Sequence, residues 1–390
     1  MAAEPRTMPN PRIVVTPALG SDLSRHTGLR LGFLTRLEVG TDAADSYRFA
    51  LEVFEAAEAL GYDVGWIAQH HFLNGEGRLP SVFPFLAAAA QRTRRIGLGT
   101  GVVTLPLEDP IRVAEDAAFV DTLSGGRLEL GLGTGGDPLT FSAFGLDVEA
   151  RRERYAEGFL ALHDALAGRP INGTDAVLYP AAPTLPERIW EATFSVEGGA
   201  RIGQHGSGLL LARTAAHVRD PADVVQEPIA QAYLQALTSN THDHAAVAPG
   251  LPLSRARERG AGGEGLPTGS GGEVLPRVGM SRTVYAAADL ATAMAHLDGG
   301  ISAWVKSLIS RGAFPTGLSR EEAYARIHVH YGHPEEVVES IRADKLTPLS
   351  TDLICQVQPG DPTPDQILKS LELVAREVAP ALGWRPSQSP

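Results

Sequence analysis

The stretch RIGLGTGVVTLPLEDPIRVAEDAAFVDTLSGGRLELGLGTGG, residues 95–136, contains one complete strand–helix–strand unit. Its first part is a short apolar run that ends at Pro106, which indicates a strand. The middle part begins at Pro110 and ends in two glycines, the pattern that commonly starts and stops a helix. The last part is again apolar and runs into a glycine-rich loop. This order predicts two parallel strands joined by a helical crossover.

The same alternation continues on both sides of residues 95–136. Eight strand-then-helix units follow one another, and the strands are short and apolar on both faces, as in a parallel sheet that is buried on both sides. An open doubly wound sheet usually has fewer units, so we expect an α/β fold of the (β/α)₈ type, a TIM barrel. The expected strands lie within residues 29–37, 62–72, 95–106, 127–136, 188–194, 207–214, 277–287 and 351–358.

Two segments lack any periodicity. Residues 1–28 read as a mobile N-terminal tail ahead of a single barrel domain that spans residues 29–385. Residues 241–276 are rich in Gly, Pro and Ala, and we expect a long flexible insertion before the seventh strand. Loops that run from helix to strand lie on the barrel face away from the chemistry, and a lid over the site is the functional alternative.

The composition excludes several classes of partner. The chain has 390 residues, of which 46 are acidic and 34 basic, and its formal net charge is −12. Such a charge repels nucleic acid and anionic membrane surfaces. No apolar run approaches the roughly 20 residues that span a bilayer, and the N-terminus lacks a secretory pattern. Together with the single cysteine, Cys355, this suits a cytoplasmic protein.

Adjacent histidines, His70 and His71, stand at the end of the second expected strand. In a barrel the residues that follow the strands surround the active site, so at least one of these side chains is a candidate catalytic group. Neighbours on a strand point to opposite faces, so a single metal ion could rarely bind both. Two histidines that merely pack against their surroundings are the structural alternative.

Small and hydroxyl residues follow the third and fourth expected strands. Gly101, Thr104, Gly133 and Thr134 lie there, and glycines allow a flat ring to approach the backbone closely. Tight turning at the strand ends would explain the same glycines. The run GLGTGG resembles a dinucleotide fingerprint, but it does not open a helix directly, so a Rossmann site is not expected.

A possible phosphate cradle follows the fifth expected strand. Ser195, Gly198 and Gly199 lie at a helix start, where free backbone N–H groups favour an anion. Ser195 would serve equally well as a helix cap without a ligand. Arg213 and Thr214, after the sixth strand, could add a charge and a hydroxyl to the same phosphate, and an ordinary surface arginine is the alternative.

Taken together, these segments resemble the bacterial-luciferase-like family of flavin-dependent barrel proteins. The resemblance is clearest in AEALGYDVGWIAQHHF, in RTRRIGLGTGVVTLPLEDPIRVAEDAAFVDTLSGGRLELGLGTGG and in FGLDVEARRERYAEGF. It continues more faintly through RIWEATFSVEGGARIGQHGSGLLL and HYGHPEEVVESI. The order and spacing of the segments over most of the chain carry the resemblance, more than any one fragment does.

The resemblance implies reduced FMN bound at the C-terminal face of the barrel, and usually a homodimer. His70 matches the family histidine near the reactive edge of the flavin, with His71 as its companion. The Gly101–Val102 bond matches a position where the family often has a bulge and a non-prolyl cis peptide. Ser195 and Gly198 match the loop that holds the flavin phosphate.

Some positions depart from the luciferase pattern. Gln69 replaces an acidic residue, Gly133 replaces a reactive cysteine, and Thr134 replaces an arginine. Phe194 replaces an acidic residue beside the phosphate loop, and Gly198 offers only its N–H group. We therefore do not expect light emission. Phosphate binding would depend on backbone amides, on Ser195 and on the guanidinium of Arg213.

The function implied by the resemblance is that of a two-component monooxygenase, an oxidoreductase acting on paired donors with incorporation of O₂. A separate NAD(P)H:flavin reductase would supply FMNH₂, and the enzyme would oxygenate a small organic substrate. Hydride transfer with the deazaflavin F420 is one alternative, and a barrel that binds flavin without catalysis is another. Leu105, Phe141, Phe144 and Phe194 suggest an apolar pocket wall, or part of the core.

Overall fold

The computed structural model describes residues 28–38, 42–72, 77–214, 220–242, 275–310, 312, 314–357 and 361–386. The expected N-terminal tail and most of the expected insertion before the seventh strand lie outside these residues, so both remain predictions.

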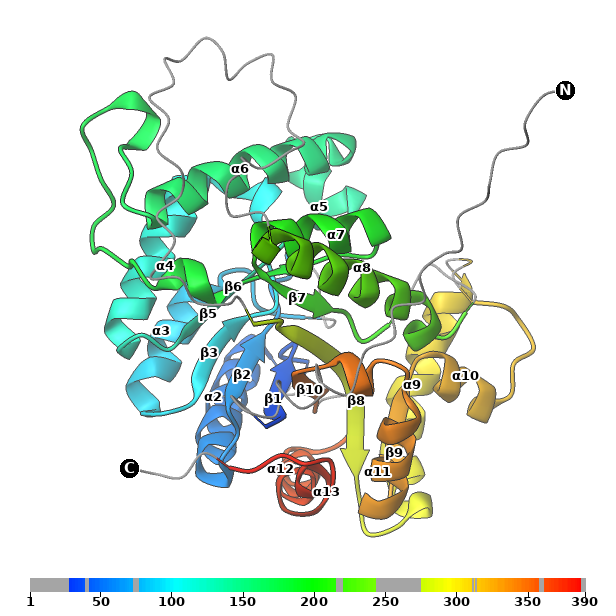
Figure 1. The fold of residues 1–390 in the computed structure, drawn as a ribbon. Helices are drawn as coiled ribbons and strands as arrows, with labels where there is room; N and C mark the ends of the chain where they lie inside the picture. The colour runs from blue at the N-terminus through cyan, green and yellow to red at the C-terminus, as the bar shows by residue number, and fades with distance from the viewer. Residues whose placement is uncertain are drawn as a thin grey trace, which may run out of the picture.

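Parallel strands form a closed barrel with helices around it (Figure 1). The order of pairing is β10–β1–β2–β3–β5–β6–β7–β8, and β8 pairs with β10 to close the ring. The (β/α)₈ barrel predicted from the sequence is thereby confirmed. The strands are β1 (Arg30–Thr35), β2 (Val64–Ile67), β3 (Gly97–Thr100), β4 (Val103–Thr104), β5 (Leu128–Gly133), β6 (Ile189–Ala192), β7 (Gly208–Leu211), β8 (Val278–Ala286), β9 (Val329–Gly332) and β10 (Asp352–Gln356).

The helix α4 begins and ends at local signals in the sequence. Asp109 caps α4 by accepting hydrogen bonds from the N–H groups of Ile111 and Arg112, and Gly125 ends it in the left-handed conformation, with φ at 73°.

Among the described residues, none of the helices combines the length and the apolarity that crossing a bilayer requires. The helices are α2 (Ala43–Leu60), α3 (Val82–Arg92), α4 (Pro110–Ser124), α5 (Pro138–Ala143), α6 (Arg151–Leu166), α7 (Val196–His205), α8 (Ala222–His242), α9 (Leu290–Ser310), α10 (Arg320–Arg326), α11 (Pro334–Ala343), α12 (Pro364–Leu373) and α13 (Ala379–Ala381).

The segment after β8 differs from the expectation of helix up to the last strand. It contains α9, α10, the strand β9 and α11, which lie together at one side of the barrel (Figure 1). The strand β9 pairs with the C-terminal half of β8, from Thr283 opposite Val329 to Ala286 opposite Gly332. A strand of this length has too few residues to set up a period, so its existence depends on the free edge of β8.

Two tryptophans fill the barrel interior. Trp66 of β2 and Trp190 of β6 are buried and meet edge to face, with ring centroids 5.6 Å apart. Glycines on the adjacent strands make room for them, because a Cβ atom on Gly99 would overlap the Trp66 ring and one on Gly208 would overlap the Trp190 ring. These glycines therefore serve packing, and the barrel core is closed below the strand ends.

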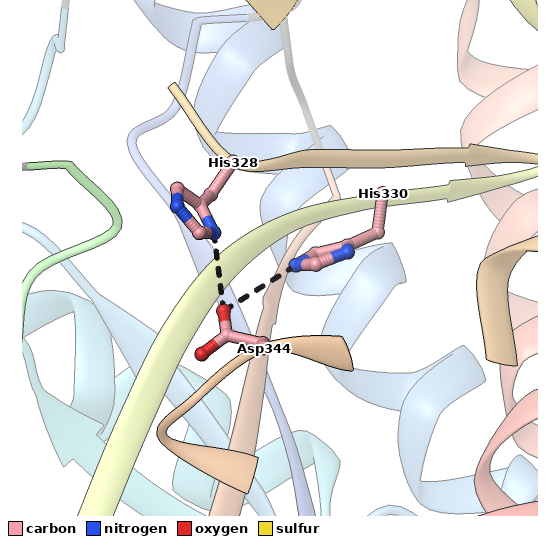
Figure 2. Close-up of side chains that lie close together, drawn as sticks. All are labelled: His328, His330 and Asp344. Atoms are coloured by element: carbon pink, nitrogen blue, oxygen red, sulfur yellow. Dashed lines mark hydrogen bonds and ion pairs between the residues drawn. The ribbon is translucent and has the colours of Figure 1, made fainter. Parts of the chain in front are cut away.

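A buried ionic cluster fixes β9 and α11 against β8. Figure 2 shows His328, just before β9, and His330, within it, both turned toward Asp344, which caps the end of α11. His328 Nδ1 lies 3.1 Å and His330 Nε2 3.8 Å from the same Asp344 oxygen, which also accepts a hydrogen bond from Arg282 Nε at 2.7 Å. The other nitrogen of His328 lies 3.0 Å from Asp223 of α8. The cluster thus joins four elements of the fold.

Replacing Gly99 by alanine should destabilise the barrel, because the added methyl group must displace the buried Trp66 ring. We expect a loss of about 1–3 kcal/mol in the free energy of unfolding, measured with urea. Gly136, in the glycine-rich loop after β5, is a control, since nothing lies within 4 Å of its Cβ position. Equal stabilities of Gly99→Ala and Gly136→Ala would contradict this packing argument.

The cluster around Asp344 should make the protein lose stability in acid. Burial, and then the charge of Arg282, lower the pKa of His330 to about 3. Burial alone would raise the pKa of Asp344, but the hydrogen bond from His328 and the charge of Arg282 outweigh it and lower that pKa. The unfolded chain therefore takes up protons at a higher pH than the folded one.

The His330 contribution is complete above pH ~6.5 and is lost as the pH falls from there toward the folded pKa; that of Asp344 is lost below pH ~4. In urea unfolding between pH 7.5 and 5, His330→Phe should flatten the pH dependence by up to about 1.4 kcal/mol per pH unit. An unchanged slope in this variant would show that His330 does not couple folding to protonation.

Candidate active site

His70 lies at the C-terminal mouth of the barrel, the end where the strands finish. Its backbone N–H donates to the Leu79 carbonyl at 2.9 Å, which fixes the chain after β2. Its ring packs against Gly77, where a Cβ atom would lie only 2.7 Å from Nδ1. Arg36, which follows β1, approaches the other nitrogen, with Nη2 at 3.3 Å from Nε2. The ring is therefore held from both edges.

The surroundings of His70 disfavour a charge on its ring. Burial, followed by the positive charge of Arg36, then His71 and Arg213, lowers its pKa to about 3. Burial also lowers the pKa of His71, and the carboxylate of Glu108 opposes that change. Of the two adjacent histidines, His70 has the stronger shift, which is typical of functional sites but also of packed ones.

The two histidine rings have different neighbours. His71 meets Phe144 edge to face at 5.0 Å between ring centroids, and Phe72 lies 5.5 Å from Phe144. Phe72 is 64% and Phe144 43% exposed, so this aromatic cluster faces solvent beside His70. Phe144 thus belongs to a wall at the mouth, whereas Phe141 and Leu105 are buried in the core.

The third strand carries a bulge beside the end of β2, where the Gly101 N–H donates to the Ile67 carbonyl at 2.7 Å. Gly99 pairs with Glu129 and Val103 with Leu132, so β3 and β4 contain one residue more than β5 over the same distance. The Gly101–Val102 bond at this point is cis, as the family resemblance implies. Val102 packs on the interior tryptophan cluster, so the bulge covers the barrel core at the end where the strands finish.

Glycines of β5 and its loop accommodate the bulged strand. A Cβ atom added to Gly131 would overlap the carbonyl of Thr100. One added to Gly133 would lie 2.5 Å from the Val102 side chain, and one added to Gly135 would lie 2.5 Å from the Thr104 side chain. The close approach of two strands therefore explains Gly133, which we expected to face a flat ring or to turn the chain. Next to it, Thr134 is partly buried, and its hydroxyl lies 3.3 Å from the Gly135 carbonyl.

Gln69 ties the end of β2 to the segment after the bulge. Its amide nitrogen donates to the Pro80 carbonyl and to Glu108, and its oxygen accepts from the Thr104 N–H at 2.8 Å. In the sequence Gln69 stood out only as a missing acidic residue. The structure gives it a positioning role that spacing alone does not reveal.

The segment after β6 forms the start of α7. Ser195 caps this helix, because its hydroxyl oxygen accepts a hydrogen bond from the Gly198 N–H at 3.1 Å. That oxygen thus serves as a helix cap without a ligand, as the sequence also allowed. The hydroxyl proton is still available to donate. A Cβ atom on Gly199 or Gly203 would overlap backbone carbonyls of α8, at Ile229 and Tyr233 respectively. These glycines let the two helices touch.

A buried carboxylate holds α7 at its other end. Glu191 of β6 accepts from the Tyr155 hydroxyl at 2.8 Å, and His205, the last residue of α7, lies 2.8 Å away through Nδ1. The sequence pattern did not single out this group, because its partners come from α6 and from the far end of α7. The amides at the helix start are thus positioned from both ends.

Arg213 lies after β7, with its guanidinium stacked on Trp304 of α9 at 4.0 Å. Its charge also contributes to the lowered pKa of His70. The structure therefore relates Arg213 to the His70 side of the mouth, and gives no direct support for the expected sharing of a phosphate with Ser195.

Unpartnered polar atoms near the mouth leave capacity for a ligand. The Ser281 and Thr283 hydroxyls are buried and have no hydrogen-bond partner among the described residues. They share a face of β8 with Gly279, whose Cβ position looks onto Leu210 and Ile354 inside the barrel. A flavin ring, with several heteroatoms on one edge, is a group that such hydroxyls could bind.

The His328–His330–Asp344 cluster is the one group among the described residues with metal-ligand character. The Asp344 oxygen between the histidines already accepts from Arg282, which is fully buried. A cation placed there would meet a fixed positive charge, so the arrangement fits an ion-pair network better than a metal site.

Comparison with known proteins agrees with the fold. The family model for luciferase-like monooxygenases matches residues 29–347. Among solved structures, the monooxygenase RslO1 from Streptomyces bottropensis has a TM-score of 0.70 and 24% identity, over 90% of this chain and 99% of that one. The oxygenating constituent of 3,6-diketocamphane monooxygenase from Pseudomonas putida, in complex with FMN, has a TM-score of 0.67 and 17% identity, over 91% and 99%. The F420-dependent tetrahydromethanopterin reductase from Methanopyrus kandleri has a TM-score of 0.62 and 16% identity, over 91% and 99%.

Curated relatives match in shorter parts. The 4-hydroxyprotoasukamycin monooxygenase of Streptomyces nodosus subsp. asukaensis is 42% identical over 35% of this chain and 37% of its own length. Limonene 1,2-monooxygenase of Rhodococcus erythropolis is 35% identical over 44% and 46%. The oxygenase component of trigonelline monooxygenase from Acinetobacter baylyi is 26% identical over 40% and 48%. The chain thus spans about half, or less, of the length of these relatives.

The family match extends over most of the chain, and the closed barrel agrees with it. The chain belongs to the luciferase-like monooxygenase family.

Proposed function

We propose that this protein is an FMN-dependent monooxygenase that uses O₂ to oxygenate a small organic substrate. Bound reduced flavin would supply the oxygen-activating chemistry. The observation that carries the proposal is the barrel mouth, where Arg36 meets His70 after β2 and the next strand carries the bulge at Gly101–Val102. Solved relatives with this fold include one in complex with FMN.

The chain's own residues would divide the work of holding the cofactor. The bulge and Thr104, with Gly133 and Thr134 behind it, would support the ring, and the hydroxyls of β8 would meet its polar edge. Ser195, through its hydroxyl proton, and the positive end of α7 at Val196 and Glu197 would bind the phosphate. Gly198 and Gly199 would hold this end in place, because their N–H groups donate to the hydroxyl and carbonyl oxygens of Ser195. Arg213 would add positive charge near the ring.

The aromatic cluster of His71, Phe72 and Phe144 would shelter the reacting edge and exclude water. An apolar wall of this kind suits an organic substrate with little charge.

We further propose that a separate NAD(P)H:flavin reductase supplies the reduced flavin, since one relative is named as the oxygenase component of its enzyme. A cytoplasmic location suits both partners and the buried free cysteine, Cys355. Hydride transfer with F420 is the second candidate, because an F420-dependent reductase shares the fold.

The Ser195→Asp variant tests the phosphate site. Aspartate caps helices as well as serine does, so α7 should stay folded, while its negative charge repels a phosphate. We expect the affinity for FMN to fall at least about tenfold, which corresponds to about 1.4 kcal/mol, and the affinity for riboflavin to stay the same. Fluorescence titration measures both ligands. An equal loss for both, or for neither, would place the phosphate elsewhere.

Mixing photoreduced FMN with oxygen tests the reaction. In the presence of the protein, oxidation of the flavin should become slower than for free FMN, because the site excludes water from the activated flavin. Oxidation at the rate of free FMN, together with tight binding of F420, would instead favour the hydride-transfer function. Retained FMN affinity without any change in oxidation would favour a non-catalytic flavin-binding barrel.

We also propose a homodimer that uses the outer face of α4. Phe119 and Leu123 lie one turn apart on this helix and are 55% and 41% exposed, so they form an apolar pair on its outer face. Phe119→Glu should shift the protein toward the monomer in sedimentation velocity at micromolar concentration. Leu139→Glu, at another exposed apolar position, is the matched control and should leave the oligomeric state unchanged. A monomeric unmodified protein would refute the dimer.

A further inference from the structure

Arg36 forms a bridge between a carboxylate and the imidazole of His70. Its Nη1 lies 3.0 Å from Glu38 and its Nη2 3.3 Å from His70 Nε2. The side chains of Arg36 and Glu38 are only 18% and 16% exposed, so solvent screens the contact weakly. The guanidinium is therefore held from one side by Glu38 and faces the histidine on the other.

The chemistry of the two groups determines the state of the ring. A guanidinium has donors and no acceptor, so the contact requires a lone pair on His70 Nε2. A neutral imidazole with a lone pair on Nε2 carries its proton on Nδ1. A doubly protonated ring would instead place two like charges beside each other. Gly77 lies beside the Nδ1 edge, since a Cβ atom there would come within 2.7 Å of Nδ1, and this nitrogen has no hydrogen-bond partner among the described residues.

We propose that Arg36 is a positioning residue for His70, which it holds as the neutral tautomer with the proton on Nδ1. His70 would then shape the site without changing its charge, and Arg36 would supply a positive charge at the same edge. That charge does not depend on pH in the working range, because a guanidinium stays protonated. The inference about the tautomer is independent of the proposed function. Only the further point, that the Nε2 edge of His70 faces a bound flavin, rests on the proposed function.

The other charged groups around His70 act in the same sense. After burial, Arg36 following β1, His71 on the same segment and Arg213 following β7 all lower the pKa of His70, and the Ala68 backbone opposes them. Glu38 neutralises part of the Arg36 charge and pairs with Nη1, whereas His70 faces Nη2. The histidine is thus surrounded by groups that keep it neutral.

Nuclear magnetic resonance of ¹⁵N-histidine-labelled protein, free of flavin, tests the inference. The spectrum of a His70→Asn variant assigns the His70 signals. In the unmodified protein we expect the pattern of a proton on Nδ1, with no titration between about pH 5 and 8. In Arg36→Met the preference for Nδ1 should be lost and the midpoint should rise by about one pH unit or more. Arg36→Lys, which keeps a donor and a charge, should restore much of the original pattern.

Arg48→Met is the control, because Arg48 also pairs with a carboxylate but lies exposed on α2. It should leave the His70 signals unchanged, and thermal unfolding establishes that each variant is folded. A proton on Nε2, a midpoint near 6.5 in the unmodified protein, or an unchanged tautomer in Arg36→Met would overturn the inference. Because these measurements need no flavin, they stand even if FMN titration shows no binding and the proposed function fails.

Discussion

The mouth of the barrel depends on the close approach of the third strand to β5. The third strand carries one extra residue at Gly101–Val102, and the extra backbone has to lie somewhere. Room exists only because β5 and its loop present glycines at positions 131, 133 and 135, where any side chain would meet the bulged strand. The bulge in turn rests on the tryptophan core below. Strand pairing, core packing and the shape of the site therefore all depend on the space that these glycines leave for the bulged strand.

The groups around the mouth follow from this arrangement. With the third strand displaced, the side-chain oxygen of Gln69 accepts a hydrogen bond from the Thr104 N–H. This contact fixes the segment after β2 that carries His70. Arg36 comes from the neighbouring strand on the other side, and Arg213 from across the barrel. Each side chain is placed by a different strand, so the parallel barrel turns residues far apart in the chain into one surface.

Much of the fold was predictable because its signals are local. Caps, glycines and short apolar runs mark α4 and its neighbours within a few residues of each boundary, and eight such units imply a closed barrel. The strand β9 was not predictable, since it forms only where β8 offers an edge. The candidate site divides in the same way: the places of His70 after β2 and of Ser195 at the start of α7 could be predicted from local sequence. Arg36 has a role only because the second strand ends beside it.

The backbone of α7 lies directly on α8 at Gly199 and Gly203, with no side chain between the two helices. A helix seated in this way cannot tilt without opening a void, and voids in a close-packed interior cost dispersion energy. The amides at its start are thus fixed before any anion arrives. Binding there would spend little conformational entropy of the protein, so affinity should follow the shape and charge of the anion rather than the ordering of a loop.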